Sequence, residues 1–322
     1  MASSSNAGGG DGGAGAALLR TRSTRSLAEG AIRAGLMIAA GISILTTILI
    51  VLSLTKETIS FFGDVPIVEY LTGTKWTPQL SGEQASFGVV PLVAATLYIT
   101  GIAMLVAIPL GLLSAIYLAE YAPLRVRKVV KPILEILAGV PTIVFGFFAL
   151  TFLTPEILRP LFGPSVSQSN QLAAGLLVGL LVLPTIASIA EDALTSVPMS
   201  LREGAYGLGA SRLITSLRVV MPAALSGVIA GVVLGASRAI GETLVILLAG
   251  GSGQLLPGVV GSAKEDSGSM AAFIASTATG DAATGSVAYK TIFAVGFTLF
   301  VITLVLNLVS IRLVNRYRQV YE

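Results

Sequence analysis

The chain has 322 residues, of which 54% are hydrophobic and 11% charged, and its formal net charge is +3. Soluble domains carry about 25% charged residues, so this composition excludes a single soluble core and indicates a protein built in a lipid bilayer. The absence of Cys and His excludes disulfides, thiolate zinc sites and catalysis by those side chains.

Residues 1–29 are rich in Ser, Gly and Ala. A segment of this composition cannot bury enough apolar surface to fold by itself, so we expect a disordered tail. The remaining residues, 30–322, form the predicted transmembrane domain. Its first apolar run exceeds the about 7–15 residues of a signal-peptide core and is followed by no clear cleavage site, which predicts an uncleaved first span.

Six apolar runs are long enough to cross the hydrocarbon layer as helices, which takes roughly 20 residues. They are Ala34–Leu54, Pro91–Ala119, Ile133–Leu153, Leu172–Ala190, Ala223–Ala249 and Val287–Ile311. Pro109, Pro141 and Pro184 lie inside the second, third and fourth runs. Proline is tolerated in a span where neighbouring groups satisfy the freed carbonyls, so these prolines predict a packed all-α bundle.

If the six runs alternate in direction, fourteen basic residues fall on one side of the membrane and five on the other. The larger group is Arg20, Arg22, Arg25, Arg33, Arg125, Arg127, Lys128, Lys131, Arg202, Arg212, Arg218, Arg312, Arg316 and Arg318. The smaller group is Lys56, Lys75, Arg159, Lys264 and Lys290. Because cytoplasmic segments carry the excess of Lys and Arg, this partition predicts that both termini are cytoplasmic.

The loop between the fourth and fifth runs, about residues 191–222, has the signals of two short helices. Pro198 favours a helix start, Gly209 a helix end, and Ser211 a second start. A glycine suits position 209 if the turn there needs a positive φ. The apolar residues of this loop are flanked by charges, which fits a linker packed on its own bundle and also fits a docking helix for a soluble partner.

In this loop, Glu203-Gly204-Ala205 is followed by Gly209 and then by Val219, Met221 and Pro222. The spacing resembles the EAA loop of ABC importer permeases, with Gly204, Val219 and Met221 replacing the family's Ala, Ile and Leu. The resemblance implies a six-helix type I ABC importer permease bundle whose cytoplasmic coupling helix docks on an ATP-hydrolysing subunit. It gives the coupling role to Glu203, Gly204, Ala205, Gly209 and Pro222.

The fifth run carries Gly227, Gly231 and Gly235, four residues apart, and then Arg238 and Glu242. In one continuous helix these five residues share a face, which lets another helix approach closely. A charge in mid-membrane is unfavourable, by about 2.5–3.5 kcal/mol for Arg on insertion scales, so neither charged residue should face lipid. Either the two pair with each other and fix the helix register, or they line a translocation path.

The run Arg238-Ala239-Ile240-Gly241-Glu242-Thr243 resembles the fifth-span signature of the high-affinity phosphate permeases PstC and PstA. Residues 119–123, 137–146 and 201–205 resemble the same family. The resemblance covers about residues 88–311 and favours the PstC type, because Leu244-Val245-Ile246 contains no proline and the first outer loop is long. It implies a path that includes Ser237, Arg238, Glu242 and Thr243, in which Arg238 attracts phosphate and Glu242 tunes or gates it.

The resemblance also implies partners and a location. We expect a paralogous PstA-like permease, a PstB-like ATPase dimer that holds ATP and Mg, and a PstS-like phosphate-binding protein outside the bacterial cytoplasmic membrane. This chain itself would bind no cofactor, metal or nucleic acid and perform no covalent chemistry. A permease for another oxyanion (molybdate, tungstate or phosphonate), an ATP-independent channel or carrier, and a membrane-embedded enzyme are the alternatives.

The outer loops carry scattered charges and one aromatic residue of note, Trp76. The first loop, residues 56–88, also contains Glu57, Asp64, Glu69 and Glu83, and the last, residues 250–286, contains Lys264, Glu265, Asp266 and an apolar patch at Met270–Ile274. We expect most of these charges to be solvated. Nothing in either loop is specific enough to predict contacts with a binding protein.

Overall fold

The computed structural model of the chain describes residues 12–80, 82–251, 263–280 and 282–317. The chain forms two compact units, Met1–Lys56 and Glu57–Glu322. In chain order the helical elements are α1 (Gly12–Asp64), α2 (Ile67–Thr72), η1 (Gly82–Gln84), α3 (Val90–Ile116), η2 (Tyr117–Tyr121), α4 (Leu124–Gly139), α5 (Thr142–Phe148), η3 (Ala149–Leu158), α6 (Arg159–Phe162), α7 (Gln171–Thr195), α8 (Met199–Gly207), α9 (Arg212–Thr215), η4 (Ser216–Val220), α10 (Met221–Ala223), α11 (Leu225–Ile240), η5 (Ile246–Gly250), α12 (Met270–Ala278) and α13 (Val287–Tyr317). In this described part the protein is all-α apart from one isolated bridge between Trp76 and Phe87.

The first unit contains most of α1, which begins at Gly12. Residues 12–29 were predicted to be disordered, whereas the structure has them in this helix; residues 1–11 lie outside the described part. Ala14, Ala16, Ala17 and the two leucines after them are strong helix formers, and they extend the spanning helix towards the N-terminus.

In the second unit, four helical segments are long and apolar enough to span a membrane, and with α1 the described residues contain five such segments. They are Glu29–Asp64, Val90–Tyr121, Thr142–Phe162, Gln171–Thr195 and Val287–Arg316. A sixth is obtained if Arg212–Ala223 and Leu225–Ile240, which meet at an angle of 73°, are counted as one bent span. The predicted number of six therefore holds only with this bent pair.

The third span lies further along the chain than predicted. Residues 133–153 were expected to form one helix, but α4 ends at Gly139 and the spanning segment starts at Thr142. Val140 and Pro141 between them are extended, with ψ of 130° and 131°. Proline disfavours a helical conformation in the residue before it and donates no backbone hydrogen bond, so Pro141 ends α4. The separate α4 buries none of its residues in this chain.

Glycines bring α7 close to the helices on two sides of it. A Cβ added at Gly175 would lie 2.6 Å from Cβ of Ile102 in α3, and one at Gly179 would lie 2.8 Å from the Ala103 carbonyl oxygen. On the α11 side, a Cβ at Gly227 would lie 2.4 Å from that of Ala193. These contacts confirm that the predicted glycine stripe of the fifth run lets another helix approach closely, and they identify that helix as α7. The main hydrophobic core is built around the same contacts.

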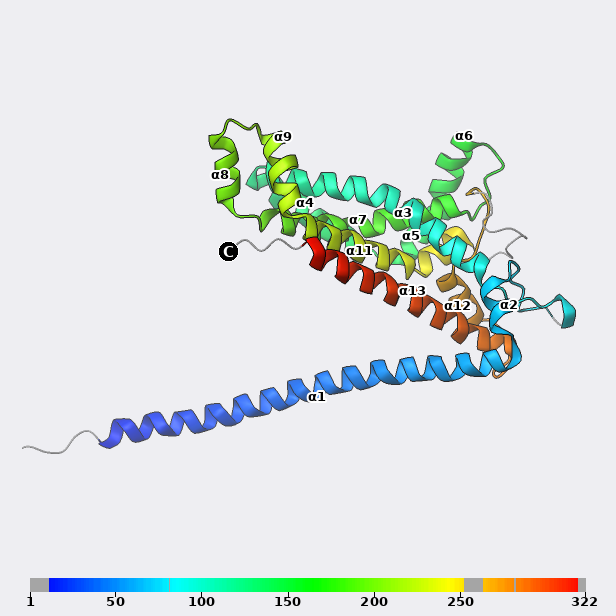
Figure 1. Ribbon diagram of the computed structural model, residues 1–322, viewed down its shortest axis with the longest axis horizontal. Helices are drawn as coiled ribbons and strands as arrows, with labels where there is room; N and C mark the ends of the chain where they lie inside the picture. Colours follow the sequence, from blue (N-terminus) through cyan, green and yellow to red (C-terminus); the bar gives the residue numbers. More distant parts are fainter. Residues whose placement is uncertain (1–11, 81, 252–262, 281, 318–322) are drawn as a thin grey trace, which may run out of the picture. The chain divides into compact units, whose positions relative to one another are not determined.

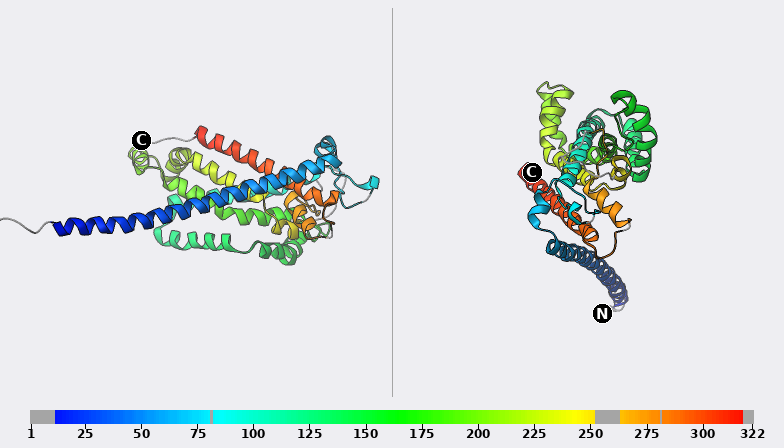
Figure 2. Two further views of the ribbon diagram at one scale, coloured as in Figure 1. Left: turned by 90° about the horizontal axis from the view of Figure 1, so that it is seen from below. Right: turned by 90° about the vertical axis from the view of Figure 1, so that its right-hand side faces the viewer.

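The two ends of the second unit differ in structure. Helices α8 and α9 extend beyond one end of α3, α7 and α11, whereas α2, α6 and α12 lie at the other (Figure 1; Figure 2, left). At the latter end, Trp76 packs in a cluster of aromatic rings with Phe61, Tyr70 and Phe273. The predicted apolar patch at Met270–Ile274 begins α12, and Met270 and Phe273 belong to the same buried cluster. Burial raises the pKa of the Tyr70 hydroxyl to about 12.

Candidate functional site

The α8–α9 loop has the local structure that its sequence predicts. Pro198 precedes α8 in an extended conformation, and Gly209 has a φ of +82° in the turn after this helix. Oγ of Ser211 accepts a hydrogen bond of 3.4 Å from the backbone N–H of Ile214 and so caps α9. All three turn signals are therefore confirmed. Residues other than glycine rarely adopt the left-handed conformation of Gly209, which explains the glycine at this position.

This loop presents its side chains to the outside of the bundle. Glu203, Gly204, Gly209 and Pro222 are exposed, and Ala205 is half-buried. The apolar side chains beside them are also uncovered in this chain, among them Met199 (61% exposed), Leu208 (91%) and Leu213 (59%). Apolar residues at this exposure on adjoining turns argue against a linker packed on its own bundle. They form, with Glu203, a surface that fits a partner protein.

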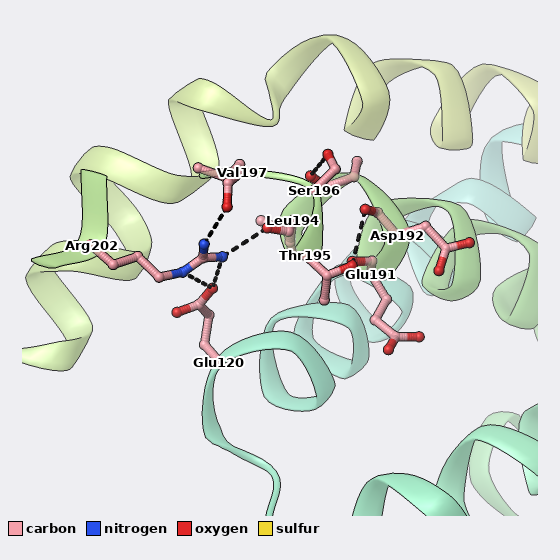
Figure 3. Close-up of polar contacts among 9 residues, drawn as sticks. Glu120, Glu191, Asp192, Leu194, Thr195, Ser196, Val197 and Arg202 are labelled. Carbon is pink, nitrogen blue, oxygen red and sulfur yellow. Dashed lines mark hydrogen bonds and ion pairs between the residues drawn. The ribbon is translucent and has the colours of Figure 1, made fainter. Parts of the chain in front are cut away.

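Arg202, the residue before Glu203, turns in the opposite direction and is buried. Its Nη2 lies 2.9 Å from Oε1 of Glu120, at the end of α3, and 2.8 Å from the carbonyl oxygen of Leu194 (Figure 3). Nη1 donates a hydrogen bond of 2.5 Å to the carbonyl of Val197. The sequence places Arg202 among the basic residues of one membrane side and in the 201–205 motif, but it does not predict this contact, because Glu120 lies 82 residues away.

A second buried carboxylate lies on the last turns of α7. Glu191 is 1% exposed and forms ion pairs with Arg127 (2.5 Å) and Lys131 (3.0 Å) of α4. The hydrogen bond to Glu191 raises the pKa of the Lys131 ammonium, and Asp192, at 3.2 Å, acts in the same direction. Since α4 has no buried residue, these ion pairs are the main polar attachment of α4 to α7. The sequence predicts a topology role for Arg127 and Lys131 but not this pairing.

The four predicted path residues do not lie on one continuous helix. Helix α11 ends at Ile240, and residues 241–243 are not helical. Oε1 of Glu242 accepts hydrogen bonds from the backbone N–H groups of Thr243 (3.2 Å) and Val245 (3.5 Å). Glu242 thus caps the next helical segment, and a capping residue is itself non-helical. The predicted single helix through residue 249 is wrong for this reason.

Arg238 and Glu242 also form no ion pair with each other in the described part of the chain, contrary to the register-fixing interpretation. Instead, Nη1 of Arg238 donates a hydrogen bond of 3.0 Å to Oγ1 of Thr185 in α7. Oγ of Ser237 lies 2.9 Å from Oδ1 of Asn307 in α13. Arg238 is exposed in this chain, whereas Ser237, Glu242 and Thr243 are half-buried. An exposed guanidinium can bind an oxyanion by donating two parallel hydrogen bonds to it.

At the opposite end, the charged outer residues take mixed positions. Asp64 and Lys290 form an ion pair of 2.6 Å between the end of α1 and the start of α13. Glu57 and Glu69 are exposed or half-buried, and the side chain of Glu83 lies outside the described residues. Trp76 is buried and so offers no surface to a partner.

Comparisons with known proteins agree with this architecture. The family model described as "Binding-protein-dependent transport system inner membrane component" matches residues 107–319. The probable ABC transporter permease protein YqgH of Bacillus subtilis is 36% identical over 219 residues, which are 67% of this chain and 70% of that protein.

Two phosphate transport system permease proteins are also similar. PstA 1 of Mycobacterium tuberculosis is 35% identical over 162 residues, which are 49% of this chain and 51% of that protein. PstC of Mesorhizobium japonicum is 30% identical over 195 residues, which are 55% of this chain and 57% of that protein. The chain therefore spans little more than half the length of these PstA and PstC relatives.

Solved structures share the fold at low identity. A chain of a bacterial alginate ABC transporter, in complex with an alginate-bound periplasmic protein, matches with a TM-score of 0.58 and 17% identity, covering 88% of this chain and 96% of its own length. A chain of the inward-facing methionine transporter MetNI matches with a TM-score of 0.53 and 19% identity, covering 72% and 95%.

Proposed function

Because this chain belongs to the binding-protein-dependent transport system inner membrane components, the permeases of ABC transporters, we propose that it carries inorganic phosphate inward across a bacterial cytoplasmic membrane. It would do so as one permease subunit of an ATP-driven importer that alternates between outward- and inward-open states. The observation that carries this proposal is the exposed surface of α8, with Glu203 and the positive φ of Gly209.

Helix α8 supports docking of an ATPase. The surface of α8 and of the residue after it combines a carboxylate, Glu203, with the uncovered apolar side chains of Met199 and Leu208. Association buries such apolar side chains, and a flanking charge fixes their orientation on the partner. Gly204, Ala205, Gly209 and Pro222 complete the proposed coupling surface, with Gly209 in the turn that follows α8. An ATP-independent channel or carrier has no use for a surface of this kind.

Phosphate as the substrate is supported by the PstA and PstC relatives and by Arg238. The open face of its guanidinium matches the geometry of a phosphate, and Thr185 keeps one end of the group in place. Glu242, at the interruption after α11, would limit the residence of the anion through repulsion. Ser237 and Thr243 offer hydroxyl groups next to these two charges.

We propose the following assembly. A paralogous PstA-like permease would complete the path, a PstB-like ATPase dimer would bind ATP and Mg beneath α8, and a PstS-like protein would deliver phosphate at the end formed by α2 and α12. Both termini would then lie in the cytoplasm, as the distribution of basic residues predicts. This chain would perform no covalent chemistry and would hold no cofactor of its own.

Uptake of labelled phosphate into vesicles tests this function. The chain is reconstituted with its partner permease, ATPase and binding protein, and uptake is measured with ATP or with a non-hydrolysable analogue. ATP-dependent uptake that excess molybdate, tungstate or phosphonate does not reduce is the expected result. Uptake of one of these competitors in place of phosphate would overturn the substrate, and uptake without ATP hydrolysis would overturn the importer.

A further inference from the structure

We propose that the buried ion pair of Glu120 and Arg202 positions α8 on the bundle and transmits its displacement to α3 and α7. Both would be positioning residues for transport, acting through the helices that they join. This inference rests on the proposed function, because it requires an ATPase to displace α8.

Arg202 is the one side chain of α8 that is buried. Leu201 and Ala205 are half-buried, and the other residues of this helix are exposed. A force applied to the exposed face of α8 therefore reaches the bundle through Arg202, through the packing of Leu201 on the buried cluster that includes Leu194 and Val220, and through the chain segments on either side. The contact at Arg202 is the polar one, with directed bonds to groups at the ends of α3 and α7.

The guanidinium connects three helices at one point. Nε and Nη2 lie 3.3 Å and 2.9 Å from Oε1 of Glu120, which belongs to η2 at the end of α3. Nη2 and Nη1 also donate to the carbonyls of Leu194 in α7 and Val197 in the turn before α8. Carbonyls at a helix C-terminus lack partners within the helix, and a cation there complements the helix dipole. Arg202 thus caps the C-terminal end of α7 and links α8 and the end of α3 to it (Figure 3).

Glu120 lies in a helical segment of unusual geometry. The segment Tyr117–Tyr121 is a π-helical turn, in which the Ala122 N–H donates a hydrogen bond of 2.8 Å to the Tyr117 carbonyl. Such turns are frequent at functional sites, although η3, η4 and η5 of this chain are also π-helical. Here the turn carries Glu120, whose side chain is 4% exposed.

A gain in folding stability does not by itself explain a buried ion pair between Glu120 and Arg202. Desolvation offsets most of the attraction between buried charges, so apolar residues of similar volume stabilise a fold as well or better. A planar guanidinium can, however, hold a carboxylate and two carbonyls in fixed directions at once, which an ammonium or an apolar group cannot. The arrangement suits a joint that keeps three helices in register while they move.

The test measures ATP hydrolysis and phosphate uptake separately in the complete reconstituted importer. Glu120→Gln keeps the shape of the side chain and removes its charge. We expect the complex to assemble and to hydrolyse ATP, while the phosphate taken up per ATP falls roughly tenfold, as for other mutations that affect coupling. Arg202→Lys, which keeps the charge but loses the two carbonyl contacts, should give an intermediate ratio.

Glu135→Gln is the matched control, because Glu135 is an exposed carboxylate in α4 with no ion pair among the described residues. It should leave the ratio of uptake to hydrolysis unchanged. If Glu120→Gln behaves like this control, or if it lowers uptake and hydrolysis in equal proportion, the transmission role is wrong. If the unmodified importer takes up no phosphate with ATP, the proposed function fails instead.

A covalent replacement of the pair gives a second readout. The chain contains no cysteine, so Glu120→Cys with Arg202→Cys places a single reactive pair in this chain. Before cross-linking, the double variant should be uncoupled like Glu120→Gln. Joining the two thiols with a bifunctional reagent of suitable length should restore the ratio of phosphate uptake to ATP hydrolysis. If the purified cross-linked importer keeps the low ratio of the double variant, the proposal is wrong.

Discussion

Nη1 of Arg238 lies 3.0 Å from Oγ1 of Thr185, so the charged end of α11 is held against α7 one residue after Pro184. Proline at this position leaves a carbonyl of α7 without its helical donor, which makes the region more polar than the surrounding helix. Arg238 is thereby fixed by one nitrogen and leaves the rest of its guanidinium available.

Replacing Arg238 should reduce transport strongly. Arg238→Ala removes a charge-assisted contact and should lower phosphate uptake by roughly 10- to 100-fold. Arg238→Lys keeps the charge but lacks the planar guanidinium, so its phosphate uptake should lie between that of the unmodified chain and that of Arg238→Ala. Uptake in proteoliposomes provides the measurement, and Lys128→Gln, an exposed basic residue on α4, is the control. Unchanged uptake in Arg238→Ala would remove this residue from the path.

Losing the hydrogen bond to Arg238 should have a smaller effect. Thr185→Val keeps the side-chain shape and removes the hydroxyl that accepts this hydrogen bond, while the exposed guanidinium can bond to water in its place. We expect the concentration of phosphate at half-maximal uptake to rise by less than about tenfold, since the charge of Arg238 remains. A loss as large as that of Arg238→Ala would mean that Thr185 itself contacts the anion.

The turn at Gly209 should be sensitive to any side chain. Gly209→Val places a β-branched residue at a φ of +82°, and the left-handed region disfavours such residues by roughly 1–2 kcal/mol. Stimulation of ATP hydrolysis by the permease should fall, as it should in Glu203→Ala. Gly207→Ala is the control, because a Cβ there meets nothing within 4 Å. Full stimulation in both Gly209→Val and Glu203→Ala would refute docking through α8.

Filling the space between α3 and α7 should destabilise the bundle. Gly175→Val would force a side chain against Ile102 and lower the stability by about 1–3 kcal/mol, the usual range for overpacking. Thermal unfolding in detergent, monitored by circular dichroism, measures the change. Gly101→Ala, in the same region of α3 but with nothing within 4 Å of its Cβ, should unfold almost as the unmodified chain does.

The attachment of α4 to α7 should depend on pH on the alkaline side. The pKa of Lys131 is raised by Glu191, so the ion pair contributes fully below the unfolded lysine pKa of about 10.4 and is lost as the pH rises through the higher folded value. Proteolysis of α4 should therefore stay constant from neutral pH to about pH 10 and increase above it. Lys131→Gln should remove most of that increase; an equal increase in this variant would point to another group.

Local signals predicted local structure well. Pro198, Gly209 and Ser211 each act on the next few residues, so their effect on the chain can be recognised without the tertiary fold. Pro141 is also a local signal for a helix end, but the apolar run continues on both sides of it, so the sequence predicts one span where the structure has two helices. Glu242 was placed in a helix because hydrophobicity continues to Ala249, although its own carboxylate caps the next segment.

Contacts between distant residues were not predictable in the same way. Glu120 and Arg202 are 82 positions apart, and basic residues at a cytoplasmic end are expected for topology alone. Both residues lie in motifs that resemble the same permease family, but this resemblance does not indicate which residues contact each other. The same holds for the ion pairs of Glu191 with Arg127 and Lys131, which can be predicted only if the direction of α4 after Pro123 is known.

The glycines on both sides of α7 limit the ways in which the molecule can change shape. Gly175 and Gly179 let it approach α3, and Gly227 and Gly235 let α11 approach it, so closely that an added Cβ at any of the four would lie within 3 Å of a neighbouring atom. A shift of α7 along its axis would drive branched side chains into these narrow spaces, so we expect the three helices to move together. We then expect alternation of access to occur where the helices are interrupted, at Pro141, Ala224 and residues 241–243.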